Sequence, residues 1–198
     1  MALIAVDIDD TLYSFSEAAR DECLSRGHDV AAYTQWNDWR APVDMLGPDE
    51  WADVIKSVHT HRIIRSRRAF PGASEILWGL HEAGHDIFYI STRSPDTAGA
   101  TRDWLSENFF PRPKRLVATL DDKQQYLESA EFLIDDRPKT LVQYCFGNYS
   151  IEELTKRPRA FALQTLYNHN LTDVPGIFVS PTWRGFAKGF RKAGLLDS

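Results

Sequence analysis

The stretch that decides the fold runs from residue 3 to residue 11 and reads Leu3-Ile4-Ala5-Val6-Asp7-Ile8-Asp9-Asp10-Thr11. An unbroken apolar run that stops at acidic residues is typical of a strand buried on both faces, with its carboxyl end opening onto a site. The same pattern predicts further strands at Ile87 to Ile90, Leu116 to Ala118, Phe132 to Ile134, Ala160 to Leu163 and Ile177 to Val179.

Helical segments alternate with these strands. Pro71-Gly72 leads into apolar residues spaced for one helix face, from Ile76 to Ala83, and Gly84 follows where a helix is expected to end. Trp104 lies in a comparable segment before Pro111. The alternation predicts an α/β fold, with a Rossmann-like parallel sheet covered by helices on both faces. In such sheets, ligands bind at the carboxyl ends of the strands.

One stretch, from Tyr13 to Phe70, breaks the alternation. It contains helix-like segments at Glu17 to Arg26 and Asp49 to Thr60 but no convincing strand. We interpret residues 13–70 as a small helical cap inserted after the first strand, and residues 1–12 and 71–198 as the core domain. The polar segment from Asn148 to Arg159 reads as a surface excursion.

Composition limits the class of protein. The 198 residues are 43% apolar, enough for one core and a small lobe, and the net charge of -5 offers no general attraction to nucleic acid or to an anionic membrane. Cys23 and Cys145 lack the spacing of a metal site or a disulfide framework. With neither a signal peptide nor an apolar run of the ~20 residues that a membrane span requires, we expect a cytoplasmic protein.

Acidic, hydroxyl and basic side chains follow successive predicted strands. Of the two carboxylates Asp7 and Asp9, one can attack phosphorus while the other donates a proton to the leaving oxygen, although such residues also cap helices or face solvent. Ser91 can donate a hydrogen bond to a phosphoryl oxygen, and Lys123 can supply a positive charge. Taken alone, each of these two reads as a turn or surface residue.

Asp135 and Asp136 end another predicted strand. Adjacent carboxylates repel one another unless a hard cation lies between them and Asp7. The four features together, in this order along the chain, indicate a metal-dependent phosphoryl-transfer site.

The set resembles the four motifs of haloacid dehalogenase-like phosphatases, over roughly Leu3 to Thr140. Within that superfamily it is most similar to the 5'(3')-deoxyribonucleotidases. Five segments carry this resemblance: Asp7 to Phe15, Phe70 to Ala73, Asp122-Lys123, Leu133 to Pro138, and Ala160 to Asn168 with Tyr167. The resemblance implies Asp7 as the nucleophile and Asp9 as the general acid and base. It also implies Mg²⁺ held by Asp7, the Asp9 backbone carbonyl and Asp136, with Asp135 behind them.

Two features of the sequence depart from the nucleotidase pattern. Asp10 replaces a glycine that is common there, and Ser91-Thr92-Arg93 is more similar to the Ser-x-Arg of polynucleotide-end phosphatases. Thr92 and Arg93 join three cap aromatics, Phe15, Trp36 and Trp39, as candidate substrate-binding residues. For the aromatics, base stacking and packing of the cap core stay open alternatives.

The leading hypothesis is a Mg²⁺-dependent phosphomonoesterase that hydrolyses nucleoside or deoxyribonucleoside monophosphates through an aspartyl phosphate. A phosphatase for nucleic-acid ends is the alternative, motivated by Arg93 and the basic run from Arg62 to Arg68, which also reads as a solvated face. Another small phosphate ester and a non-catalytic phosphate-binding role are further alternatives. The expected partner is a small phosphorylated substrate; no membrane or stable nucleic-acid binding is expected, and the oligomeric state, a homodimer included, is left open.

Overall fold

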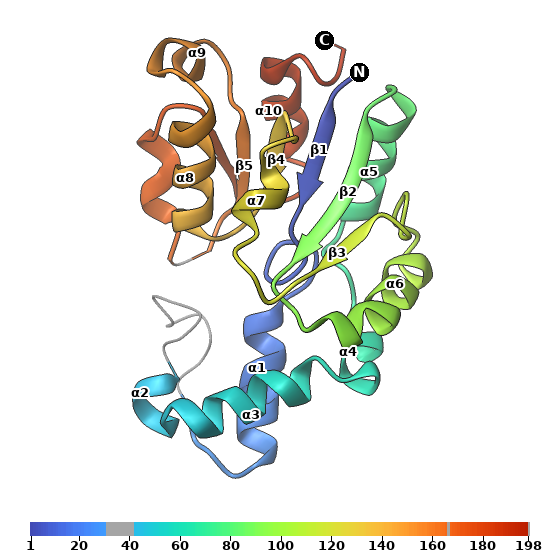
Figure 1. Ribbon diagram of the computed structural model, residues 1–198, viewed down its shortest axis with the longest axis vertical. Coiled ribbons are helices and arrows are strands. Elements are labelled where there is room, and N and C mark those ends of the chain that lie inside the picture. The colour runs from blue at the N-terminus through green and yellow to red at the C-terminus, as the bar shows by residue number, and fades with distance from the viewer. Residues whose placement is uncertain (31–41, 166, 198) are drawn as a thin grey trace.

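Six parallel strands form a single sheet in the computed structural model, which describes residues 1–30, 42–165 and 167–197 (Figure 1). The strand order is β3-β2-β1-β4-β5-β6. The strands are β1 (Leu3–Val6), β2 (Asp86–Ser91), β3 (Leu116–Ala118), β4 (Phe132–Ile134), β5 (Ala160–Leu163) and β6 (Ile177–Ser180). Each of the six predicted strands is present, so the predicted parallel α/β sheet is confirmed.

The sheet register brings the ends of three strands together. Val6, the last residue of β1, lies opposite Tyr89 of β2 and Ile134 of β4. The backbone N–H of Asp7 then donates to the Ile134 carbonyl at 2.8 Å. Residues that follow β1 and β4 therefore start from neighbouring points on the same edge of the sheet.

Helices cover both faces of this sheet. The helices that follow β1 are α1 (Phe15–Ser25), α2 (Val43–Leu46), α3 (Pro48–Val58), α4 (His61–Ser66) and α5 (Ala73–Glu82). Those that follow β2 to β6 are η2 (Pro95–Thr97), α6 (Ala98–Glu107), α7 (Gln124–Leu127), α8 (Pro138–Asn148), α9 (Ile151–Lys156), η3 (His169–Asp173) and α10 (Phe186–Ala193).

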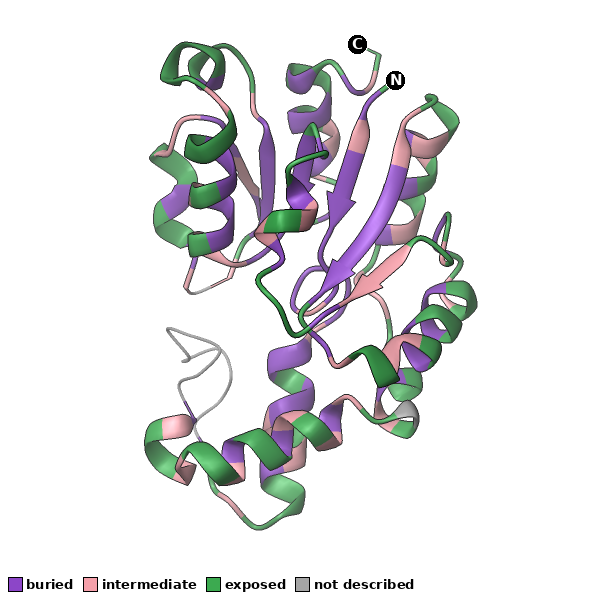
Figure 2. Cartoon of the chain, in the orientation of Figure 1, coloured by how far each residue is buried: buried purple, intermediate pink, exposed green. Residues whose placement is uncertain are grey.

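The side chains of β1 alternate between two hydrophobic clusters, as the period of a strand requires. Ile4 and Val6 belong to the cluster that contains the buried faces of α5, α6 and α10. Ala5 belongs to the second cluster, with the buried residues of α8 and Leu154 of α9. Burial on both faces accounts for the unbroken apolar run, and Figure 2 shows β1 and β2 as mostly buried.

The helices α1 to α4 lie at the carboxyl end of the sheet (Figure 1). Ser14 caps α1, because its hydroxyl accepts a hydrogen bond from the Glu17 backbone N–H at 3.2 Å. Trp51 and Val54 of α3 are buried in the same hydrophobic cluster as Ile4 and Val6. Apolar packing thus continues without a break from the sheet into these helices.

The segment from residue 148 to residue 159 differs from the sequence-based interpretation. It contains α9, which starts at a capping box: the Ser150 hydroxyl accepts from the Glu153 backbone N–H, and the Glu153 carboxylate accepts from the Ser150 backbone N–H. Leu154 of this helix is buried. Five of the six residues of α9 are exposed, as expected of a surface excursion, but the sequence-based interpretation did not include the helix or its buried Leu154.

Candidate active site

The predicted catalytic residues converge at the carboxyl edge of the sheet. Asp7 follows β1, Ser91 ends β2, and Asp135 and Asp136 follow β4. Lys123 comes from the loop after β3, immediately before α7. All five side chains are buried, although they come from four strand ends that lie far apart in sequence.

Lys123 joins two of the carboxylates. Its Nζ lies 2.8 Å from Asp7 Oδ1 and 2.5 Å from Asp135 Oδ2. Burial alone would lower the pKa of Lys123, but the charges of Asp135 and Asp7 outweigh it and raise that pKa. Lys123 therefore stays positively charged beside the nucleophile that the motif predicts.

Asp7, Asp135 and Asp136 form a carboxylate cluster in which one oxygen of each residue lies within 4.8 Å of the others. Burial raises the pKa of Asp7 to about 7 even though Lys123 opposes the shift. Burial, and then the charges of Asp135 and Asp7, raise the pKa of Asp136 well above its ordinary value. One lysine therefore does not neutralise three crowded carboxylates, whereas a hard divalent cation would. This donor set fits such a cation.

The two motif carboxylates Asp135 and Asp136 have different partners. Asp135 accepts from Lys123 and from the Arg137 backbone N–H at 2.8 Å. Asp136 accepts from the Tyr167 hydroxyl at 2.5 Å and, over 3.4 Å, from the Thr11 hydroxyl. Because Asp135 already pairs with Lys123, Asp136 is the better ligand for a bound metal ion.

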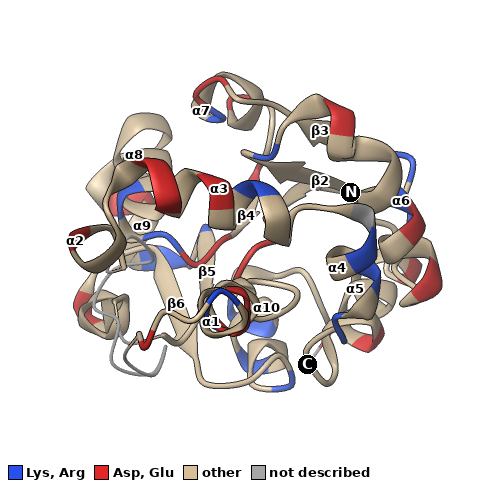
Figure 3. Ribbon diagram, turned by 90° about the horizontal axis from the view of Figure 1, so that it is seen from below, with Lys and Arg blue, Asp and Glu red and all other residues tan. Residues whose placement is uncertain are grey.

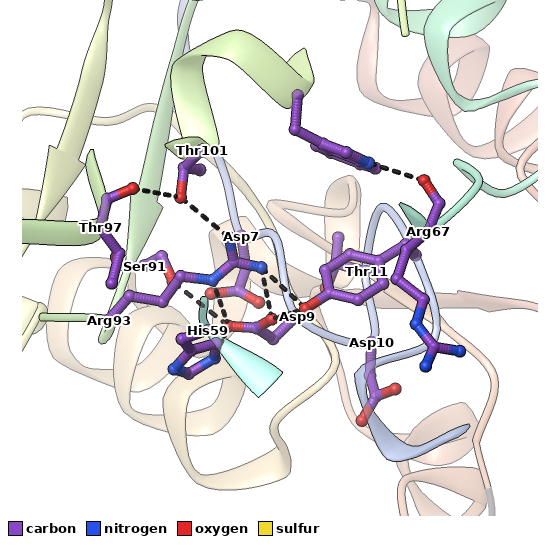
Figure 4. Close-up of polar contacts among 12 residues, drawn as sticks. Asp7, Asp9, Asp10, Thr11, His59, Arg67, Ser91, Arg93, Thr97 and Thr101 are labelled. Carbon is purple, nitrogen blue, oxygen red and sulfur yellow. Dashed lines mark hydrogen bonds and ion pairs between the residues drawn. The ribbon is translucent and has the colours of Figure 1, made fainter. Parts of the chain in front are cut away.

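Asp9 is held by an arginine from the loop after β2 (Figure 4). Arg93 donates from Nε to Asp9 Oδ2 at 3.0 Å and from Nη2 to Asp9 Oδ1 at 2.6 Å. The Tyr13 hydroxyl donates to Asp9 Oδ1 at 2.8 Å, and Ser91 Oγ lies 3.4 Å from Oδ2. His59 Nε2 lies 3.6 Å from the same Oδ2. Burial would raise the pKa of Asp9, but Arg93 and His59 outweigh it and hold that pKa well below its ordinary value.

Arg93 was expected among the substrate-binding residues, and the structure gives it a different setting. Its side chain has no exposed surface, and besides Asp9 it donates to the Thr101 hydroxyl at 2.9 Å and the Tyr13 hydroxyl at 2.9 Å. The guanidinium group is therefore engaged within the protein and is not exposed to bind a substrate.

Asp10 lies at the position where the resemblance to nucleotidases led us to expect glycine. Its backbone φ of 54° lies in the left-handed region that favours glycine. The carboxylate compensates by accepting hydrogen bonds from the Ser16 backbone N–H at 2.9 Å and the Ser16 hydroxyl at 2.5 Å. The turn after the nucleophile is thereby tied to the first turn of α1.

A cavity of about 110 Å³ opens onto these residues. Its lining comes from the loops after β1, β2 and β4, from α1 and from α3 with the residue that follows it: Asp7, Asp9, Asp10, Phe15, Ile55, His59, Thr92, Asp136 and Arg137. Phe15 packs against His59, with ring centroids 5.4 Å apart. The predicted residues Phe15 and Thr92 are thus brought to the site, whereas Trp36 and Trp39 lie outside the described residues. A larger cavity of about 730 Å³ shares Asp10 with the first one and lies over the loops after β5 and β6.

Sequence reasoning missed three side chains that the structure brings to the carboxylates: Tyr13, His59 and Tyr167. Tyr13 and His59 sit in the segment read as the cap, and nothing in their local pattern indicates that they face Asp9. Tyr167 was part of the string that carried the resemblance, without a role of its own.

The parallel sheet and the ordered set of Asp7, Asp9, Ser91, Lys123 and the Asp135-Asp136 pair define a phosphatase of the haloacid dehalogenase-like superfamily. The family model described as "5' nucleotidase, deoxy (Pyrimidine), cytosolic type C protein" matches residues 1–171. The chain belongs to this family and is a 5'-nucleotidase-like phosphatase.

Individual relatives agree with this membership. A protein of Oceanobacillus iheyensis named "Putative nucleotidase" is 26% identical over 156 residues, which are 71% of this chain and 80% of the relative. A solved hydrolase from Pseudomonas syringae superposes with a TM-score of 0.63 at 16% identity, covering 97% of this chain and 99% of that one. A haloacid dehalogenase-like protein from Streptococcus pneumoniae gives 0.61 at 14% identity, covering 95% and 98%. At these identities the two structures show the fold.

Among the described residues, no helix is long and apolar enough to cross a membrane.

Proposed function

We propose that this phosphatase hydrolyses nucleoside or deoxyribonucleoside monophosphates in the presence of Mg²⁺, through an aspartyl phosphate on Asp7. One observation carries the proposal: the buried Asp7 carboxylate lines a cavity together with Asp9 and Asp136. Asp7 also pairs with Lys123 and forms part of the carboxylate cluster. A nucleophile, a charge-stabilising group and an acid–base partner are the parts that a two-step phosphoryl transfer needs.

In the first step, an Asp7 oxygen attacks phosphorus and the bond to the ester oxygen breaks, while Asp9 takes up a proton from the phosphate monoanion of the substrate and donates it to that oxygen. In the second step, Asp9 takes a proton from a water molecule that attacks the aspartyl phosphate, and inorganic phosphate leaves. In the free protein, Arg93 lowers the pKa of Asp9 and keeps it ionised. The negative charge of a bound phosphoryl group would raise the pKa of Asp9 again and allow it to take up a proton. We expect Ser91 and Lys123 to donate hydrogen bonds to the phosphoryl oxygens.

The carboxylate cluster supports a resident divalent cation. Asp7, Asp136 and the Asp9 backbone carbonyl would hold it, and Asp135 would stay with Lys123. The cation would neutralise charge on the phosphoryl oxygens and on the crowded carboxylates. Mg²⁺ is preferred over Ca²⁺ because the larger and looser coordination shell of Ca²⁺ disturbs an in-line displacement.

We also propose that the helices within residues 13–70 act as a cap that selects the substrate. Phe15, Ile55 and His59 form the cap side of the cavity. An aromatic ring at this position can stack on a base, and such stacking is worth about 1–3 kcal/mol. The name of the family and that of the relative from Oceanobacillus iheyensis favour a nucleotide over other small phosphate esters.

A nucleic-acid end is a weaker candidate, because three of the five arginines that motivated it have acidic partners within the chain, whereas Arg62 and Arg68 are exposed. Arg93 is buried against Asp9, Arg65 pairs with Glu107, and Arg67 pairs with Asp21. Figure 3, viewed from the cap side, shows acidic residues interspersed with the basic ones. The ion pairs of Arg65, Arg67 and Arg93 thus reduce the positive charge that this segment could offer to a phosphate backbone.

A substrate screen tests the proposal. Purified protein is dialysed against a chelator, supplied with Mg²⁺ or Ca²⁺, and offered nucleoside monophosphates, sugar phosphates and a phosphorylated oligonucleotide. We expect release of phosphate from a nucleoside monophosphate with Mg²⁺ and little with Ca²⁺ or after chelation. Undiminished turnover after chelation would contradict the metal role, and preference for the oligonucleotide or a sugar phosphate would contradict the substrate class.

A further inference from the structure

Two adjacent residues between β5 and η3, Tyr167 and Asn168, both contact Asp136 of the carboxylate cluster. Asp136 lies 31 and 32 residues earlier in the chain. The contact is therefore made by the fold and not by local sequence.

Tyr167 contacts the side chain of Asp136. Its hydroxyl donates to Asp136 Oδ2 at 2.5 Å, and it lies 3.3 Å from Asp10 Oδ2. Asp10 is itself held at both carboxylate oxygens by Ser16 at the start of α1. The hydroxyl thus sits between two carboxylates that are anchored on different elements, which restricts rotation of the Asp136 side chain.

Asn168 contacts the backbone of the same residue. Its side chain is fully buried, and Nδ2 donates both to the Asp136 carbonyl at 3.0 Å and to the Leu163 carbonyl at 2.8 Å. Its Oδ1 accepts from the Thr165 backbone N–H at 2.7 Å. Both amide protons and the amide oxygen are used, so Asn168 is locked and in turn fixes the backbone from which Asp136 projects.

Asp135 provides the contrast within the same pair. Asp135 accepts hydrogen bonds from a lysine and a backbone N–H, whereas the side chain of Asp136 accepts from two neutral hydroxyls, those of Tyr167 and Thr11. A neutral hydrogen bond orients a carboxylate and leaves its negative charge available to a cation. Partners of this kind behind a metal ligand commonly change metal affinity by about 10–100-fold.

We infer that Tyr167 is a positioning residue for the divalent cation, acting through Asp136, and that Asn168 supports it from the backbone side. The inference rests on the metal dependence that we propose for this phosphatase. Tyr167 does not itself touch the reacting atoms; it sets the orientation of a carboxylate that does.

The test measures metal binding without turnover. Wild-type protein, Tyr167→Phe and Tyr89→Phe are titrated with Mn²⁺ in the absence of substrate, and free Mn²⁺ is followed by electron paramagnetic resonance. Tyr89→Phe is the matched control, because it also removes a buried hydroxyl, one that donates to the Pro111 carbonyl at 2.6 Å away from the carboxylate cluster. Both changes keep the ring, so the fold is expected to persist.

We expect Tyr167→Phe to weaken Mn²⁺ binding by at least about tenfold and Tyr89→Phe to leave it unchanged. A purely structural role of the hydroxyl would lower the unfolding midpoint in chelator without changing the affinity for Mn²⁺. Equal affinity of Tyr167→Phe and wild type, or the same loss in both variants, would overturn the inference alone. Absence of Mn²⁺ binding by the wild type would overturn it together with the proposed metal dependence.

Discussion

The Asp9–Arg93 pair offers a sharp quantitative test of the site geometry. Replacing Arg93 by methionine keeps the unbranched stem, but removes two hydrogen bonds to Asp9 and one each to Thr101 and Tyr13. The pair is largely buried, since the Arg93 side chain is 0% and the Asp9 side chain 23% exposed. Asp9 would then keep its negative charge with little water to solvate it.

Removing one partner of a buried ion pair typically costs about 3–5 kcal/mol. We expect about 3 kcal/mol for Arg93→Met, at the lower end, because Asp9 is partly exposed and retains Tyr13 and His59 as neighbours. For a chain of this length, such a loss lowers the melting temperature by about 6–12 °C.

The assay is urea unfolding of four proteins: wild type, Asp9→Asn, Arg93→Met and the double variant. We expect a coupling free energy of about 2 kcal/mol between the two positions, because residues in one hydrogen-bonded network do not act additively. A coupling below about 0.5 kcal/mol, or an Arg93→Met variant as stable as wild type, would refute the pairing of Arg93 with Asp9.

Further predictions concern the cap, the nucleophile loop and the thiols. Phe15→Leu should raise KM for a nucleoside monophosphate and leave kcat for a small aryl phosphate nearly unchanged, since stacking acts on ground and transition states alike; equal losses on both substrates would point to damage of the cap. Asp10→Gly should unfold with about 1–2 kcal/mol more free energy than Asp10→Ala, because both lose the Ser16 contacts and only alanine meets the steric penalty at φ 54°; equal stability would contradict that strain. Burial raises the pKa of Cys145 to about 12, so its thiol should resist alkylation in native protein at pH 8 and react after unfolding; rapid native labelling would contradict the packing.

The architecture was predictable from the sequence because each strand is an apolar run with a polar stop. Burial on both faces leaves no room for polar residues within β1 or β4, and the first polar residues after them mark the carboxyl edge where the site lies. The helix α9 was not predicted, although Ser150-x-x-Glu153 has the pattern of a capping box. The mostly polar composition of the segment was interpreted as a sign of irregular structure.

The site was predictable in its anionic and cationic parts and less so in their partners. Four charged residues could be predicted because each follows an apolar strand: Asp7, Lys123, Asp135 and Asp136. In the structure they are in contact. The pairing of Arg93 with Asp9 spans 84 residues, so no local pattern reveals that this guanidinium faces inward. The same holds for the hydroxyl of Tyr167, whose nearest acceptor lies 31 residues away.

The left-handed backbone of Asp10 is a third feature that sequence reasoning noticed only indirectly. The resemblance to nucleotidases led us to expect glycine where this chain has Asp10. The φ of 54° explains why glycine would suit this position, because the left-handed region favours a residue without a Cβ atom. The contacts from Ser16 explain how a residue with a Cβ is tolerated there.

The central claim is that Asp7 carries the phosphoryl group, and its most direct measurement combines a trapped complex with one variant. A crystal structure with beryllium fluoride and Mg²⁺ should place the phosphoryl mimic on an Asp7 oxygen, within reach of Lys123. Asp7→Asn should remain folded, because it removes one charge from a crowded acidic cluster, and its turnover should fall to background. A mimic bound to another residue, or an Asp7→Asn variant that keeps more than about a hundredth of wild-type turnover, would contradict the assignment.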